Sequence, residues 1–262
     1  MKIRWMTTAS LLITSGDYTI AFDPFLGMPL DRPLDDPGEP ELANEYRKAA
    51  RVFLTHGHFD HTYHLNEIYN YSRTPIFGTP AATENIRTGA DYLPHMVEII
   101  RPGYKNVHGP FEIEAYQGRH CKFDLPIVIR TLLNKRTLTN LRRLREIQAM
   151  RKVYRENGEM LFYELRCEGK RIQIMGSMGM DPDTDYPTGA DLLIMALQGR
   201  SDQDEYAMKF VERLKPGKIF LYHTDDSFPP MSSDVDTLGF EINAKRAGFE
   251  TISPEKGKEY EI

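Results

Sequence analysis

Short apolar runs separated by turn residues fill the first part of the chain, and this pattern predicts β-strands. Residues 9–14 and 17–22 are two such runs, and Gly16 between them predicts a hairpin. The proline-rich segment 26–40 then predicts an irregular loop. Residues 51–55 follow as a short buried strand that leads directly into a cluster of polar side chains.

Helical signals follow at several places along the chain. Thr62 is placed to cap one helix and Pro80 to open another, while Ser201 and Asp204 have the spacing of a capping box. From these signals, the predicted helices cover about 62–71, 80–87, 202–214 and 234–247.

The segment from Arg130 to Arg155 differs from the rest, with nine Arg or Lys residues and one acid, Glu146. Apolar residues recur in it at every third position, which resembles the stripe of a helix that ends near Gly158. These residues are Leu138, Leu141, Leu144, Ile147 and Met150. Without this segment the chain would hold 33 − 9 = 24 basic and 38 − 1 = 37 acidic residues, so positive charge is concentrated here.

Strand patterns return in the second half of the chain and alternate there with helices. The later strands predicted are 111–116, 160–167, 171–175, 191–196 and 218–222. In each half of the chain, strands come first and strands mixed with helices follow. That order suits two packed sheets with helices on the outside.

Composition narrows the classes of protein. The chain has 262 residues, which is enough to bury a core without a structural metal, so a bound metal would serve chemistry. A net charge of −5 argues against a general nucleic-acid binder. The two cysteines, Cys121 and Cys167, are too few and too far apart for a disulfide framework, which favours a cytoplasmic location. No apolar run approaches the roughly 20 residues that a membrane helix needs, so we expect no membrane partner.

The segment Thr55-His56-Gly57-His58-Phe59-Asp60-His61 carries the strongest chemical signal. Four metal-ligand side chains lie within six residues, directly after the predicted strand 51–55. His56 and His58 alternate in the strand sense and so leave the chain on one side. Asp60 and His61 fall in the following turn and can face a second position. Imidazole nitrogens with a carboxylate form a donor set that suits zinc.

This motif resembles the signature of the metallo-β-lactamase superfamily. The resemblance implies an α/β fold, a four-layer αββα sandwich, with a basic helical insertion near residues 130–157. It also implies one domain over 1–262, in which the insertion occupies about 126–158. The general layout looks most similar to the lactonase-like branch of the superfamily.

Carried over residue by residue, the resemblance implies two metal positions. His56, His58 and His120 would hold one ion, and Asp60, His61 and His223 the other. Asp60 and His61 would also be the catalytic residues, with a solvent hydroxide as nucleophile. Asp23, before Pro24, would support a ligand histidine through a hydrogen bond. We expect the remaining histidines, His64, His95 and His108, to be structural.

The pattern departs from the superfamily at Ser177, which stands where a bridging aspartate is usual. A neutral serine is a poor replacement for a charge shared between two cations. Three interpretations stay open: a second metal that binds weakly, Asp181 reaching back into the site, or a degenerate site that serves binding only. The donor set permits one or two zinc or manganese ions, with iron as a weaker alternative.

The predicted function is hydrolysis of an ester, lactone or phosphodiester of a small molecule by metal-activated hydroxide. The Arg-rich segment, and Arg200 at the expected rim of the site, suit an anionic substrate, although a solvated helix face or a homo-oligomer contact would also explain the segment. Two alternatives are a non-catalytic binding module and a mono-iron dioxygenase. A nuclease is disfavoured by the acidic remainder of the chain.

Overall fold

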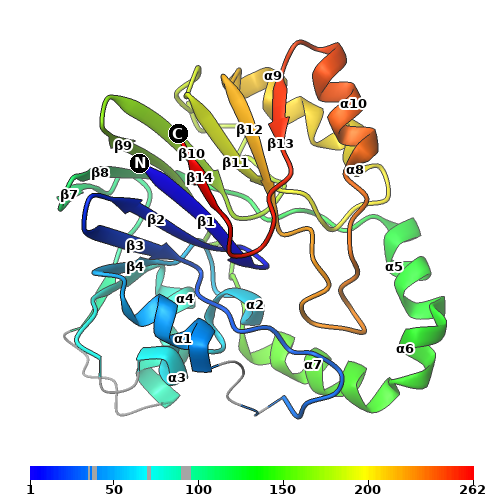
Figure 1. The fold of residues 1–262 in the computed structure, drawn as a ribbon. Coiled ribbons are helices and arrows are strands. Elements are labelled where there is room, and N and C mark those ends of the chain that lie inside the picture. The colour runs from blue at the N-terminus through cyan, green and yellow to red at the C-terminus, as the bar shows by residue number, and fades with distance from the viewer. Residues whose placement is uncertain (35, 37–39, 70–71, 90–95) are drawn as a thin grey trace.

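The computed structural model describes residues 1–34, 36, 40–69, 72–89 and 96–262. Within these ranges, two seven-stranded sheets pack face to face, with helices on their outer surfaces (Figure 1). The strands of the first sheet, in spatial order, are β14 (Glu259–Glu261), β1 (Lys2–Thr7), β2 (Ser10–Ser15), β3 (Tyr18–Phe22), β4 (Arg51–Phe53), β5 (Ile76–Gly78) and β6 (Val97–Ile99). Those of the second are β13 (Glu250–Ile252), β12 (Lys218–Tyr222), β11 (Leu192–Ala196), β10 (Lys170–Met175), β9 (Leu161–Cys167), β8 (Phe111–Gln117) and β7 (Lys105–His108).

Each sheet changes from antiparallel to parallel pairing part-way across. In the first sheet β1 to β3 are antiparallel and β3 to β6 are parallel. In the second, β7 to β10 are antiparallel and β10 to β13 are parallel. The parallel strands β4, β11 and β12 consist largely of buried apolar residues, as strands covered on both faces require.

An apolar core fills the space between the sheets. Phe22 and Phe53 of the first sheet contact Tyr163 of the second, with ring centroids 5.3 Å and 5.9 Å from it. The buried hydroxyl of Tyr163 donates a hydrogen bond to the carbonyl of Leu54, at 2.6 Å. This bond fixes the end of β4 against β9, and the candidate motif begins one residue later.

Helices cover the outer face of each sheet. On the first sheet these are α1 (Pro40–Arg47), α3 (Leu65–Tyr69) and α4 (Pro80–Gly89). On the second they are α8 (Gln203–Tyr206), α9 (Met208–Leu214) and α10 (Leu238–Arg246). The predicted αββα sandwich is therefore confirmed.

Three helices, α5 (Leu125–Leu133), α6 (Lys135–Thr139) and α7 (Leu141–Val153), curve past one end of the sandwich, around the loop that follows β12 (Figure 1). The predicted stripe from Leu138 to Met150 lies on α7 except for Leu138, which lies on α6, so the single helix predicted for it is confirmed only from Leu141 onward. Asn134 and Asn140 stand at the two helix junctions, and the side chain of Asn134 accepts a hydrogen bond from the backbone N–H of Arg136. Asn side chains compete for backbone groups in this way and so favour caps over helix interiors.

Other local predictions also need correction. The helix predicted from Thr62 is two short ones, because α2 (Phe59–Thr62) already starts inside the motif and Thr62 bonds back to the carbonyl of His58. The capping box at Ser201 does not form, since its hydroxyl bonds to Asp124 instead. The hairpin at 15–18 and the helix opening at Pro80 are confirmed.

No helix among the described residues is both long and apolar enough to span a bilayer.

Candidate metal centre

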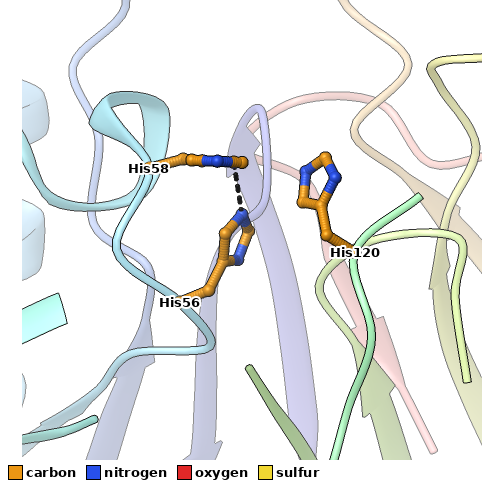
Figure 2. A group of neighbouring side chains, drawn as sticks. All are labelled: His56, His58 and His120. Atoms are coloured by element: carbon orange, nitrogen blue, oxygen red, sulfur yellow. Dashed lines mark hydrogen bonds between the residues drawn. The ribbon is translucent and has the colours of Figure 1, made fainter. Parts of the chain in front are cut away.

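Three histidine side chains from two segments face one another at the end of the sandwich (Figure 2). His56 and His58 lie in the loop after β4, and His120 lies three residues beyond β8. Nε2 of His56 is 3.1 Å from Nδ1 of His58. The ring centroids of His58 and His120 are 4.5 Å apart. The structure therefore brings together the three residues predicted for the first metal position.

A second group forms beside it from Asp60, His61 and His223. Oδ2 of Asp60 is 3.6 Å from Nε2 of His61 and 3.3 Å from Nε2 of His223. The rings of His56 and His61 are 3.9 Å apart between centroids, so the two groups are in direct contact. The six predicted ligands thus form one continuous cluster.

Asp23 supports this cluster through contacts with Thr55 and His61. Its carboxylate is fully buried and accepts hydrogen bonds from the backbone N–H of Thr55 at 2.7 Å and from the Thr55 hydroxyl at 2.6 Å. The same carboxylate lies 2.9 Å from Nδ1 of His61. With Nδ1 of His61 directed at a carboxylate, Nε2 is left to face Asp60.

Thr55 orients His56 in the same way. Because its hydroxyl proton is given to Asp23, the hydroxyl oxygen can accept a hydrogen bond from Nδ1 of His56, 3.0 Å away. Nδ1 of His120 is 2.8 Å from the carbonyl of Cys121, to which it donates. Nε2 therefore stays unprotonated on both His56 and His120, as a metal ligand requires.

Close backbone packing fixes the motif. A Cβ at Gly57 would overlap the carbonyl of Arg155, and one at Gly176 would overlap the side chain of Thr55. Glycine at these two positions lets the chain segments approach one another. The loop after β4 is thereby held against β10 and the segment that follows α7.

His223 reaches the cluster through a turn that its own backbone makes. It follows β12 directly and has a φ of 58°, in the left-handed region that few residues other than glycine adopt. Its backbone N–H donates to the carbonyl of Thr8. The next turn is held by Asp225, which accepts hydrogen bonds from the Thr7 hydroxyl and the Thr8 N–H. Asp23 also has a positive φ, 43°, and such strain often gathers at functional sites.

Burial and neighbouring charges set the protonation of the cluster. Burial lowers the pKa of His58 to about 3 and that of His120 to about 4. Burial alone would lower the pKa of His61, but the carboxylates of Asp23 and Asp60 outweigh it and raise the pKa. Burial would raise the pKa of Asp60, and His61 and His223 reverse that effect and lower it. His58 and His120 are thus neutral at pH 7, and Asp60 is ionised.

The donor set fits a metal ion. With bonds of about 2.0–2.1 Å, tetrahedral geometry separates two ligand atoms by about 3.3 Å. The distances of 3.1 Å between His56 and His58 and 3.3 Å between Asp60 and His223 are close to that value. Nδ1 of His223 is buried and has no hydrogen-bond partner among the described residues, so this ring has a polar atom that its protein surroundings leave unsatisfied.

A cavity of about 410 Å³ opens above the cluster. Its floor includes His58, Asp60, His61, His120 and His223. Its walls come from α5, from α7 and from the loops that follow β11 and β12.

Three further residues were singled out in the sequence without a settled role, and the structure places them differently. Ser177 lines the cavity, and its hydroxyl accepts a hydrogen bond from the N–H of Cys121 at 3.0 Å. Arg200 also lines the cavity, but Asp202 and the carbonyl of Lys122 hold its guanidinium. Asp181 is not brought to the cluster.

The carboxylate of Asp181 accepts hydrogen bonds from the N–H of Asp183 and the hydroxyl of Thr184, within its own turn. Of the histidines expected to be structural, His64 contacts Phe25 and Tyr63, and His108 bonds to the hydroxyl of Tyr104. His95 lies outside the described residues.

Sequence reasoning missed two contributors to the site. Thr55 directly precedes His56, but its hydroxyl links both His56 and His61 to Asp23 at the end of the neighbouring strand, a contact that local sequence does not show. Arg151, on α7, lines the cavity, and its guanidinium lies 5.7 Å from the ring centroid of Phe123. The concentration of basic residues between Arg130 and Arg155 indicated such a residue but not which one it would be.

Comparison with known protein families gives one match over most of the chain. A family model described as a beta-lactamase superfamily domain matches residues 18–224. Two curated proteins named UPF0173 metal-dependent hydrolase are also similar. The one from Pyrobaculum islandicum is 33% identical over 79 residues, and the one from Roseobacter denitrificans is 31% identical over 83 residues. Each alignment covers 30% of this chain. The chain spans only about a third of the length of these curated relatives, 32% in each case.

Solved structures share the fold at low sequence identity. Igni18, a metallo hydrolase from Ignicoccus hospitalis, has a TM-score of 0.62 at 16% identity and covers 100% of this chain and 98% of its own. YhfI, a metallo-beta-lactamase fold protein from Bacillus subtilis, has a TM-score of 0.60 at 15% identity, covering 99% and 98%. Zn²⁺-bound PqqB from Methylobacterium extorquens has a TM-score of 0.56 at 14% identity, covering 98% and 88%.

Proposed function

The chain belongs to the beta-lactamase superfamily, and from this premise we propose that it is a metal-dependent hydrolase of a small, anionic ester, lactone or phosphodiester. The observation that carries the proposal is the paired cluster of three histidines and of Asp60, His61 and His223 on the floor of a cavity. The names of the curated relatives support hydrolysis.

In this proposal His56, His58 and His120 hold one metal ion, and Asp60, His61 and His223 hold a second. A bound divalent ion supplies Lewis acidity, which lowers the pKa of water and polarises a carbonyl or phosphoryl oxygen. Zinc or manganese suits these nitrogen and oxygen donors, and the zinc-bound relative of the same fold favours zinc. Iron, and with it a dioxygenase reaction, is the weaker choice.

The chain itself orients donors and the attacking water. Asp23 directs Nδ1 of His61, so that the opposite nitrogen faces the cavity side. Asp60 is ionised because His61 and His223 lower its pKa, and its carboxylate can accept a hydrogen bond from an attacking water and orient it. Phe59 and Phe228 line the cavity beside these groups and add apolar surface to it.

The cavity also supports an anionic substrate. Arg130 and Arg151 line it, and neither forms an ion pair with any residue that the structure describes. An unpaired guanidinium can bind a carboxylate or a phosphate through two parallel hydrogen bonds. Both cysteines are free and buried, which agrees with the proposed cytoplasmic location. A lactonase-like substrate stays one member of the proposed class.

Metal content by plasma mass spectrometry, with hydrolysis of ester, lactone and phosphodiester panels, tests the proposal. Purified protein should contain one or two equivalents of zinc or manganese and should hydrolyse at least one panel. His58→Ala should lose metal and activity together, because it removes a donor from the cluster. His108→Asn is the matched control, since His108 bonds to Tyr104 away from the cavity, and it should keep both. No bound metal after reloading would refute the proposal.

Ser177 favours one alternative, a site that binds its ligand without hydrolysis. A Ser177→Asp variant separates the two, because a carboxylate at this cavity position would add charge for a second ion. A weakened enzyme should gain up to one equivalent of metal and become more active. Unchanged metal content together with no hydrolysis by either protein would support the binding module.

A further inference from the structure

Helix α5 has no buried residue, although its sequence, LPIVIRTLL, is strongly apolar. Leu125, Ile129 and Leu133 are spaced four apart, so they lie on one face of the helix. They are 70%, 47% and 70% exposed, and none of them lines the cavity. We call these three residues the α5 outer stripe. Ile127 and Thr131, from the other side of the helix, line the cavity.

Hydrogen bonds hold the start of α5 in place and so position the outer stripe. The side chain of Asp124 caps α5 by accepting a hydrogen bond from the N–H of Ile127, and a proline occupies the first turn. The hydroxyl and backbone N–H of Ser201 both bond to Asp124 and tie this cap to the loop after β11. A helix held in this way presents its apolar face outward in a fixed position.

Basic residues accompany the stripe in the sequence. From Leu125 to Arg145 the chain has six basic residues and no acidic one. Arg136 and Arg142 form ion pairs and Arg143 is buried, which leaves Arg130, Lys135 and Arg145. Lys135, two residues after the stripe ends, is exposed and forms no ion pair with a described residue. Apolar residues continue past α5, with Leu138 54% and Leu141 47% exposed. An exposed apolar face with basic neighbours is the pattern of a helix that lies in a membrane interface.

We propose that the α5 outer stripe docks onto a membrane surface that contains anionic phospholipid. The aliphatic side chains enter the boundary between headgroups and acyl chains, while Lys135 meets the phosphates. The expectation of no membrane partner rested on the absence of a spanning segment. A peripheral helix needs only one apolar face, and the sequence pattern did not reveal that this face is uncovered.

Charge favours this occupant over a second copy of the chain. A two-fold interface would place the same basic patch against itself, and the like charges would repel. The aliphatic stripe also disfavours RNA, which is held mainly by aromatic stacking and hydrogen bonds to bases. A bilayer with anionic headgroups complements both the apolar and the basic part.

Vesicle flotation tests the proposal with the full chain. The protein should bind vesicles of phosphatidylcholine with phosphatidylserine more tightly than vesicles of phosphatidylcholine alone, and added salt should weaken binding. The triple variant Leu125→Ser, Ile129→Ser, Leu133→Ser should bind at least about ten-fold more weakly, because apolar area is lost. Lys135→Gln should weaken binding about five-fold.

The matched control is the double variant Leu238→Ser, Ile242→Ser on α10, which removes exposed apolar residues from a helix on the outer face of the second sheet. It should bind vesicles as the unaltered protein does, and circular dichroism should show that both variants are folded. Equal vesicle binding by the stripe variant would overturn the proposal. A dimer detected by light scattering that the stripe variant abolishes would also overturn it. So would RNA binding that the stripe variant abolishes and that added vesicles do not reduce.

Discussion

Asp23 supports the candidate centre without facing the cavity. It receives two hydrogen bonds from Thr55 and lies against the ring of His61, so it links the end of β3 to the motif after β4. Parallel pairing of β3 with β4 brings these strand ends together, with Phe22 opposite Phe53. A charge in this position raises the basicity of a ligand histidine and fixes its orientation.

Replacing Asp23 by Asn should therefore weaken metal binding by about 10–100-fold, because the amide keeps the size of the carboxylate and loses its charge. Titration of zinc against a chelator of known affinity measures the change. Asp181→Asn is the control, and its affinity should match that of the unaltered protein. An unchanged affinity in the Asp23 variant would show that His61 needs no support from this carboxylate.

Among the elements, α7 connects the outlying helices to the sandwich. Its Ile147 is fully buried in a cluster with Phe25 and Phe59. The guanidinium of Arg143 is buried beside it and donates to the carbonyls of Pro29 and Arg32, at 2.5 Å each. The helix thus packs against the loop after β3, which the sequence predicted as irregular.

The substitution Arg143→Met should lower the free energy of unfolding by about 2 kcal/mol, because two carbonyls lose charged donors. The neighbouring Arg145 is exposed, so Arg145→Met on the same helix should change stability by less than about 0.5 kcal/mol. Urea denaturation followed by circular dichroism compares the two. Equal stability of both variants would mean that the apolar contacts alone hold α7.

For the whole molecule, buried neutral histidines determine stability in acid. Burial lowers the pKa of His64 to about 3, and its Nε2 has no hydrogen-bond partner among the described residues. The unfolded chain takes up a proton near pH 6.5, whereas the folded protein resists it until much lower pH. Stability contributed by the neutral ring is therefore complete above pH 6.5 and is lost as the pH falls toward 3.

The variant His64→Gln removes this proton uptake. Between pH 7 and pH 5, metal-free protein should lose about 2 kcal/mol more stability than the variant. Urea denaturation at the two pH values in a chelating buffer gives both numbers. Identical losses in the two proteins would show that His64 is protonated in the folded state.

The sequence by itself determined the strand–turn motif, the order of strands and helices, and the residue types of the site. Alternating and continuous apolar runs reflect burial directly, and the close spacing of His56, His58, Asp60 and His61 needs no distant contact to be recognised. The assignment of His120, His223 and Asp23 came from resemblance to a family. The structure brings these three to the motif, although no local pattern requires it.

Tertiary structure alone decided the rest. β1, α1, β5, β13 and β14 escaped prediction, and β13 and β14 are three-residue edge strands whose pairing with a distant strand defines them. The break between α6 and α7, which separates Leu138 from the rest of the predicted stripe, depends on a helix junction at Asn140 that local spacing hides. Which face of α5 meets the cavity and which stays exposed follows from packing against segments far away in the chain. Periodicity shows that a helix has an apolar face, but only the neighbours of that helix decide whether anything covers it.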